Sequence, residues 1–195
     1  MSARRWAMAG LVALVATACG GEDRELVVIT RYPEPQVDEP ALPDMTRDGE
    51  PFPLRAPDDG LLVVYFGFTN CPDVCPTTLA KVRAGLDDLG DDAERVEVAM
   101  VSVDPDRDTD VIAEYVQSFV PDAHGLATSD AADLKTLADS FGITYAVEVR
   151  PDGEVEVGHS NYLFGVDDTG TLAVTWRTDI DLDDFVADVE QLLDE

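Results

Sequence analysis

The sequence predicts an α/β domain in which a mixed β-sheet is flanked by helices and carries extra β-hairpins. Strand and helix signals alternate from residue 42 onward, which is typical of layered α/β domains. The run 61–66 (LLVVYF) is continuously apolar, as expected for a strand buried on both faces. Turn signals at 151–153 (PDG) and 167–170 (DDTG) predict late hairpins.

The first elements surround this apolar strand. Asp48-Gly49 is a turn signal and predicts a hairpin between residues 45 and 54. A helix is expected to begin at Pro76, because proline suits the first helical position. One face of that helix is apolar and is formed by Leu79, Val82, Leu86 and Leu89.

The later elements follow from apolar spacing and capping residues. Asp108 or Thr109 is the expected N-cap of a helix whose apolar side includes Ile112 and Val116. Asp130 is expected to cap the next helix, and Gly142 to end it. The other expected elements are strands over 96–103, 126–127, 145–149, 155–157, 162–166 and 172–176, and a last helix with apolar residues from 182 to 193.

The N-terminal 41 residues have the composition of an export and attachment segment. Residues 1–18 have two arginines, then an apolar run that ends in small residues, which is the layout of a secretory signal peptide. Cys19 follows as in a bacterial lipobox, where the cysteine is lipidated; an uncleaved anchor or a plain signal peptide are the alternatives. Residues 19–41 hold prolines among acidic residues and are expected to form a lipid-anchored flexible tether. Residues 42–195 are then the domain, on the extracytoplasmic face of the bacterial cell membrane.

The charge of the chain excludes some partners. The net charge is −28, with 41 acidic residues against 13 basic ones. Nucleic-acid binding is excluded, because phosphate contacts need lysine and arginine. Attraction to anionic lipid is excluded on the same ground, so membrane association should come from the N-terminal lipid.

Cys71 and Cys75 are the candidate reactive residues. They lie in the turn between the apolar strand and the first helix, where a side chain is fixed by the scaffold yet reachable. A helix N-terminus lowers the pKa of a nearby thiol, and Asp73 opposes that effect. If Cys19 carries lipid, these two cysteines remain as a pair. Two thiolates suit a soft metal ion and could equally form a reversible disulfide, so the pair alone leaves both alternatives open.

The two histidines of the chain are weaker signals. His159 lies in a short polar loop after a predicted strand, and with the two cysteines it would complete a soft metal site. His124 has no cysteine or acid arrangement around it in the sequence, and we expect it to be a surface loop residue.

Four stretches of the sequence resemble the SCO/SenC family of copper chaperones. Residues 66–77 (FGFTNCPDVCPT) resemble its cysteine signature, and residues 102–109 (SVDPDRDT) are similar to its second signature. Residues 158–160 (GHS) fall where the family carries its histidine, and 141–143 (FGI) resemble a further segment. The resemblance covers about residues 42–195. Asp110, which stands where the family usually has proline, is a small departure outside the copper site.

The resemblance implies a thioredoxin-like fold that binds one copper ion, with Cys71, Cys75 and His159 as ligands. It also implies assistance in assembling the CuA centre of cytochrome c oxidase, by copper delivery, by thiol reduction of the oxidase subunit, or by both. Two thiolates and one imidazole suit Cu(I), and such ligands also favour Cu(II) over other divalent ions. Oxidation to a Cys71–Cys75 disulfide would remove both thiolates, so copper binding and redox state should be coupled.

Two other functions remain open from the residues alone. The first is a thiol–disulfide oxidoreductase or peroxide-reducing enzyme on the same fold, in which Cys71 and Cys75 are the redox-active pair and His159 is incidental. The second is an extracytoplasmic interaction protein with a structural disulfide.

Overall fold

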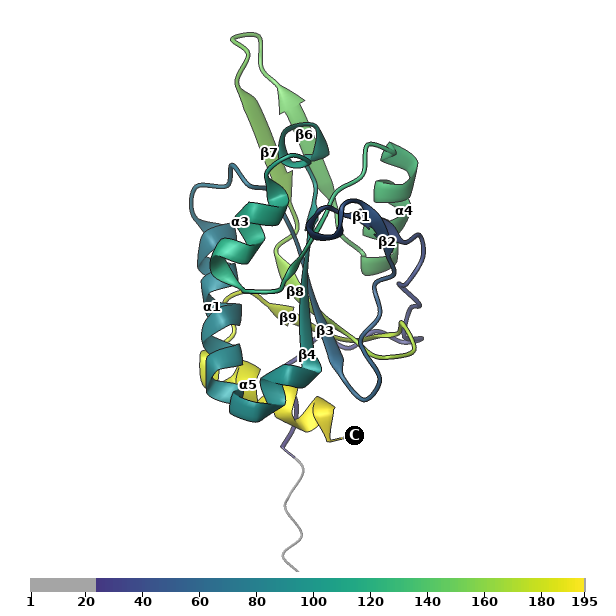
Figure 1. Cartoon of the computed structure of the whole chain (residues 1–195), viewed down its shortest axis with the longest axis vertical. Helices are drawn as coiled ribbons and strands as arrows, with labels where there is room; N and C mark the ends of the chain where they lie inside the picture. The colour runs from purple at the N-terminus through teal and green to yellow at the C-terminus, as the bar shows by residue number, and fades with distance from the viewer. Residues whose placement is uncertain (1–23, 195) are drawn as a thin grey trace, which may run out of the picture.

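A seven-stranded mixed sheet with helices on both faces forms the centre of the molecule (Figure 1). The structure, a computed structural model, describes residues 24–194. The strand order is β2-β1-β5-β4-β3-β8-β9, and the three central strands β5, β4 and β3 are parallel. The strands of this sheet are β1 (Leu42–Asp44), β2 (Glu50–Phe52), β3 (Leu61–Gly67), β4 (Val96–Ser102), β5 (His124–Leu126), β8 (Tyr162–Val166) and β9 (Leu172–Arg177).

The helices divide between the two faces of the sheet. Three of them, α1, α3 and α5, contribute to one buried apolar cluster, whereas α4 contributes to the other. Figure 1 shows the first group on the left of the sheet and α4 on the right. The helices are α1 (Val74–Leu89), α2 (Pro105–Asp108), α3 (Ile112–Phe119), α4 (Ala131–Phe141) and α5 (Leu182–Leu193), with short 3-10 segments η1 (Met45–Arg47) and η2 (Gly90–Arg95).

Strand β3 explains why both faces are apolar. Its side chains alternate, so that Leu61, Val63 and Tyr65 join the cluster under α1, α3 and α5. Leu62, Val64 and Phe66 join the cluster under α4. All six of these side chains are buried, as the continuous apolar run predicts.

The parallel pairing of β3 with β4 determines where a functional site can form. Gly67, the last residue of β3, lies opposite Ser102, the last residue of β4. Because the carboxyl ends of parallel strands meet at one edge, the loop 68–73 and the segment after Ser102 lie beside each other. The backbone N–H of Val103 donates to the carbonyl of Gly67 at 2.9 Å and joins the two segments.

A second, two-stranded sheet extends beyond this edge. Strands β6 (Tyr145–Val149) and β7 (Val155–His159) form an antiparallel hairpin that pairs with no strand of the main sheet. Figure 1 shows the hairpin projecting at the top of the molecule, past the ends of the helices. The other late hairpin, β8–β9, is part of the main sheet.

The predicted fold class is confirmed, and so are most of the elements. The turn at Asp48-Gly49 separates β1 from β2, and both turn residues have positive φ angles. Asp130 caps α4 through its side chain, and Gly142 ends that helix in the left-handed conformation. The α1 prediction needs a correction, because the helix begins at Val74, two residues before Pro76. Cys75 is therefore inside the first helical turn.

The N-terminal segment differs from the flexible tether expected over 19–41. In its described part, the backbone N–H of Ile29 donates to Thr175 of β9 at 2.8 Å, and that of Val37 donates to Gly170 at 2.9 Å. Val37 is also fully buried. The physical reason is that β9 is an edge strand with free backbone groups, and Ile29 of the segment forms a bridge with Thr175 of that strand. Residues 24–41 therefore lie against the domain.

The predicted signal peptide and Cys19 lie outside the described residues. Between residues 24 and 194, no helix is long and apolar enough to cross a membrane.

Candidate metal centre

Cys75 lies in the first turn of α1 and is completely buried. The hydroxyl of Tyr65 lies 3.4 Å from its sulfur and 3.2 Å from Oδ1 of Asn161. On the strand side, a β-carbon on Gly67 would come within 3.1 Å of the sulfur and 2.7 Å of the Tyr65 ring. A glycine at this position therefore allows the helix N-terminus to approach the strand closely enough to enclose the thiol.

Cys71 lies in the turn before α1 and is only half-buried. Its backbone N–H donates to the carbonyl of Phe68 at 3.3 Å, which closes the turn. Its sulfur accepts the backbone N–H of Cys75 at 3.3 Å, one of the orphan donors at the start of the helix. Both cysteines are free thiols. One buried sulfur and one accessible sulfur thus lie around the same helical turn.

His159 is the last residue of β7 and reaches this turn from the hairpin. Its Nδ1–H donates to the carbonyl of Ser160 at 2.9 Å, which leaves the lone pair of Nε2 free. That Nε2 lies 4.0 Å from the sulfur of Cys75. The edge-on contact of its ring with Phe68, at 5.9 Å between centroids, holds the imidazole in place.

Burial controls the protonation of this site. It raises the pKa of the Cys75 thiol to about 12, and the hydrogen bond with Cys71 adds to the effect. The sequence predicted a lowered thiol pKa from the helix N-terminus, and this is wrong for Cys75 because desolvation outweighs the dipole. Burial also lowers the pKa of His159. In the metal-free protein the two facing groups are therefore a neutral thiol and a neutral imidazole.

The separation of His159 Nε2 and Cys75 Sγ suits a bridging metal ion. Metal–thiolate and metal–imidazole bonds are about 2.0–2.3 Å long, so one ion can bridge two atoms that lie 4.0 Å apart. Among the described residues, no three His, Cys, Asp or Glu side chains converge closely enough to hold an ion as they stand. A third bond, from Cys71, therefore requires a change of the geometry around the turn. The donor set of two sulfurs and one nitrogen fits copper, while the role of these residues as ligands stays a prediction.

Asp108 is a residue of this site whose position the sequence did not indicate. We expected Asp108 or Thr109 to cap α3, but that helix begins after Val111 without a side-chain cap. Asp108 is instead fully buried at the end of α2. Its carboxylate accepts the backbone N–H of Thr69 at 3.1 Å and the Thr69 hydroxyl at 2.6 Å. It also accepts the hydroxyl of Ser102 at 2.6 Å, so it ties the cysteine turn to the end of β4.

His124 does not lie on the surface, and the prediction for it is wrong. It begins β5, is 4% exposed, and packs on the ring of Phe52. Its Nδ1–H donates to the buried carboxylate of Asp44 at 2.7 Å. The reason lies in tertiary structure, because β1 and β5 pair and bring together residues that are 80 positions apart.

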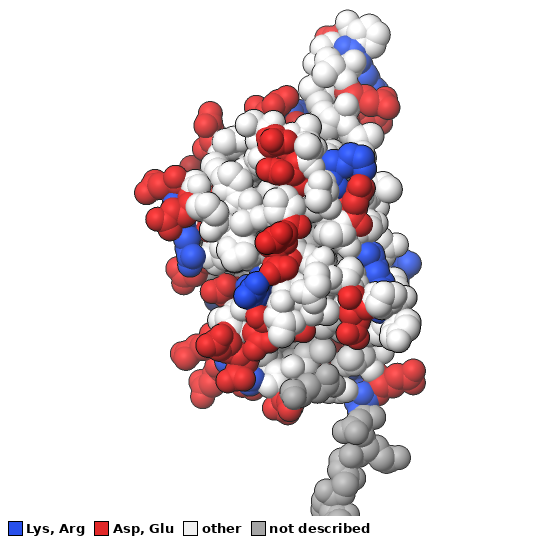
Figure 2. Space-filling view, turned by 90° about the vertical axis from the view of Figure 1, so that its right-hand side faces the viewer, with Lys and Arg blue, Asp and Glu red and all other residues white. Residues whose placement is uncertain are grey.

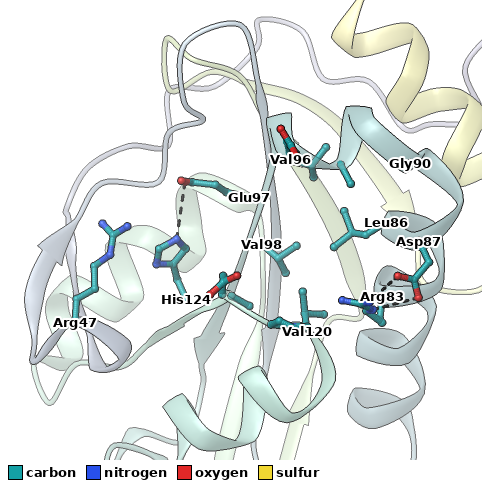
Figure 3. A pocket seen from close by; sticks show the side chains of 15 residues that line it. Arg47, Arg83, Leu86, Asp87, Gly90, Val96, Glu97, Val98, Val120 and His124 are labelled. Carbon is teal, nitrogen blue, oxygen red and sulfur yellow. Dashed lines mark hydrogen bonds and ion pairs between the residues drawn. The ribbon is translucent and has the colours of Figure 1, made fainter.

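His124 also borders a cavity of about 580 Å³ that none of the three candidate ligands lines. Figure 3 shows His124 pointing toward Glu97 on one side of this cavity and the Arg83–Asp87 pair on the other. The cavity is thus separate from the cysteine turn.

The arrangement defines a class of protein. The sheet, the helix that starts at the cysteine pair, and the histidine from an added hairpin define a thioredoxin-like protein with a dithiol–imidazole site. The profile of the SCO1/SenC family matches residues 44–194, and the chain belongs to this family.

Relatives in this family share both sequence and fold. The mitochondrial SCO1 homologue 1 of Arabidopsis thaliana is 36% identical over 104 residues, which are 52% of this chain and 31% of the relative. The apo Sco1 protein of Thermus thermophilus superposes with a TM-score of 0.68 at 31% identity, covering 88% of this chain and 99% of that one. ScoI of Bradyrhizobium japonicum, solved with copper bound, gives 0.67 at 28% identity, covering 78% and 96%.

The chain spans only part of some relatives. It covers about a third of the Arabidopsis protein and 60% of a SCO2-like protein of Rickettsia prowazekii. BsSco, described as a member of the Sco family of cytochrome c oxidase assembly proteins, shares the fold with a TM-score of 0.62 at 20% identity.

Proposed function

We propose that this protein is a metallochaperone that carries one copper ion to the CuA centre of cytochrome c oxidase. The observation that carries the proposal is the 4.0 Å approach of His159 Nε2 to the buried sulfur of Cys75, with Cys71 in the turn just before the same helix. Copper bound to a family member of the same fold, ScoI of Bradyrhizobium japonicum, supports it.

The chemistry of the three side chains suits transient holding of copper. Cys71, Cys75 and His159 would be the ligands, and two thiolates with one imidazole favour Cu(I). Because Cys75 is protonated at neutral pH, copper binding must release its proton. The half-buried Cys71 gives an accepting protein access to the ion.

The partner in this proposal is the subunit of cytochrome c oxidase that bears the CuA centre. The support is the description of the Sco family as cytochrome c oxidase assembly proteins. The proposal also includes the location that the N-terminal sequence predicts. A lipid on Cys19, after removal of a signal peptide over 1–18, would attach the domain to the extracytoplasmic face of the bacterial membrane.

The proposal is tested by copper loading followed by transfer. The reduced chain should bind about one equivalent of Cu(I), measured by competition with a Cu(I) chelator. The loaded chain should then pass the ion to a copper-free CuA domain, followed by the CuA absorption spectrum. Binding of several copper ions per chain would contradict the proposal. So would a copper-loaded chain that retains its copper in the presence of the CuA domain.

A second candidate function is thiol reduction of the same subunit, and the unequal burial of the two cysteines favours it. The accessible Cys71 thiolate would attack a disulfide of the partner and release one thiol. Cys75 would then attack Cys71, form the Cys71–Cys75 disulfide and release the second thiol, so that two electrons pass to the partner. The variant Cys75→Ser should accumulate the mixed disulfide through Cys71, detectable by mass spectrometry. A peroxide-reducing enzyme would instead turn over peroxide without copper.

A further inference from the structure

We propose that one face of the β6–β7 hairpin is the surface on which the copper-accepting protein docks. The face consists of three cross-strand pairs and is called the hairpin stripe below. The partner that fits it has an apolar patch surrounded by basic groups. This inference rests on the proposed function, because it names the recognition surface of the same site.

The register of the hairpin separates its residues into two unlike faces. Side chains of paired residues point to the same side, and the side alternates along each strand. One side carries the pairs Tyr145–His159, Val147–Val157 and Val149–Val155, which make up the hairpin stripe. The other side carries Ala146–Gly158 and Glu148–Glu156.

The hairpin stripe becomes more exposed with distance from the domain. Tyr145 and Val157, close to the domain, pack in part against the core cluster under α4. Further out, Val147 is 41% exposed and Val149 is 73% exposed. Figure 2 also shows the outer part of the hairpin standing clear of the body of the molecule. Two aliphatic side chains are thus presented to solvent on a strand that no described layer covers.

The stripe is continuous with the candidate metal centre. His159 is its inner end, and the same residue faces the sulfur of Cys75. Seven large apolar side chains are exposed in the described part of the chain. Two are on the stripe, and two more, Val74 and Val111, are beside Cys75 and just before α3. A protein seated on the stripe would therefore also lie over the copper ligands.

Asp73 and Asp110 directly precede Val74 and Val111, and both are exposed, so acidic groups rim the apolar surface on the side of the candidate metal centre. Glu148 is also exposed, but it lies on the opposite face of the hairpin from the stripe. A second copy of this chain would bring like charges together at such an interface, since the chain carries a net charge of −28. An apolar centre with an acidic rim instead selects a different protein with a basic rim.

The test compares docking with copper binding in matched variants of the full chain. The double variant Val147→Thr/Val149→Thr makes the outer stripe polar and keeps β-branched residues that suit a strand. Its control is Val27→Thr, the same change at a valine that is 49% exposed in the N-terminal segment. The probe is the copper-free CuA domain of the oxidase from the same organism. Docking is measured by titration calorimetry and copper affinity by chelator competition.

We expect the double variant to dock roughly tenfold more weakly or worse, with copper affinity within about twofold of the unchanged chain. We expect Val27→Thr to behave as the unchanged chain in both measurements. Docking should also weaken as salt rises from low to physiological concentration, because a charged rim is screened. Equal docking by the double variant, or equal loss in Val27→Thr, would overturn the inference. An unchanged chain that docks through the stripe but binds no copper would overturn the proposed function and leave the docking surface in place.

Discussion

The two histidines of this chain are both poorly exposed, yet their surroundings differ in kind. His124 donates to the buried carboxylate of Asp44 and has a second carboxylate, that of Glu97, 3.9 Å from its other ring nitrogen. His159 donates to a backbone carbonyl, and its other ring nitrogen faces the thiol of Cys75. Carboxylates thus lie on both sides of the His124 ring, whereas the thiol of Cys75 faces the His159 ring.

The partner of the second ring nitrogen therefore distinguishes the structural His124 from His159, the proposed ligand. Burial does not separate them, because His124 is the more buried of the two. The hydrogen bond to Asp44 satisfies one ring nitrogen of His124 and ties β5 to β1, and the carboxylate of Glu97 lies 3.9 Å from the other ring nitrogen. A neutral nitrogen aimed at a thiol has no such partner and gains one when a cation arrives between them.

The sharpest test of the comparison is the loss of each histidine in turn. We expect His159→Ala to weaken Cu(I) binding at least about 1000-fold, because changes to groups outside the ligand set already cost about 10–100-fold. We expect His124→Ala to leave Cu(I) affinity within about twofold. Chelator competition on the reduced chain measures both. Similar copper affinities in the two variants would contradict the division of roles.

The two variants should rank in the opposite order when the free energy of unfolding is measured. His124→Ala leaves the fully buried carboxylate of Asp44 without its imidazole partner. We expect the free energy of unfolding to fall by about 2–4 kcal/mol, measured by urea unfolding of the metal-free chain. Asp44 keeps its bonds from Thr46, which limits the loss. His159→Ala should cost less than His124→Ala, and the reverse order would be inconsistent with a structural role for His124.

Asp108 extends the comparison to a group that contacts neither histidine. In Asp108→Asn an NH₂ group replaces one carboxylate oxygen. Because this group cannot accept a hydrogen bond, the side chain can no longer accept all the hydrogen bonds from Thr69 and Ser102. A looser cysteine turn should weaken Cu(I) binding by about tenfold. As a control, Asp106→Asn changes an exposed carboxylate on the same short helix and should leave copper affinity unchanged. An affinity equal to that of the unchanged chain in Asp108→Asn would show that the turn needs no such anchor.

The smallest expected effect concerns pH. Burial lowers the pKa of His159 in the folded chain, so between about pH 6.5 and this lower pKa the unfolded chain binds more protons. The contribution of His159 to the free energy of unfolding is therefore complete above about pH 6.5. It falls as the pH drops through this window, by less than about 1.4 kcal/mol per pH unit. The loss between pH 7 and 5, measured by urea unfolding, should be smaller in His159→Gln. An unchanged or steeper loss would mean that other groups dominate.

The sequence was sufficient for the fold where the signal was local. The apolar run of β3 and the cap at Asp130 depend on neighbouring residues and were predicted correctly. The cysteine pair was placed in the right turn for the same reason, although the helix begins earlier than Pro76 suggests.

What the sequence did not predict depends on contacts between distant segments. His124 meets Asp44 only because β1 and β5 pair, and Asp108 reaches Thr69 only because β3 and β4 end at the same edge. The pKa of Cys75 is raised by a burial that is set by the packing of the helix onto β3. Such effects have no local sequence pattern from which they could be recognised.

The docked N-terminal segment restricts where the domain can stand relative to a membrane. Arg24 pairs with Asp184 and Asp188 of α5, at the end of the molecule opposite the hairpin in Figure 1. If Cys19 carries lipid as we propose, four residues lie between it and Arg24, and the five extended steps from Cys19 to Arg24 span at most about 18 Å. The end of the molecule that carries α5 would then stay within about that distance of the bilayer, while the β6–β7 hairpin lies at the opposite end.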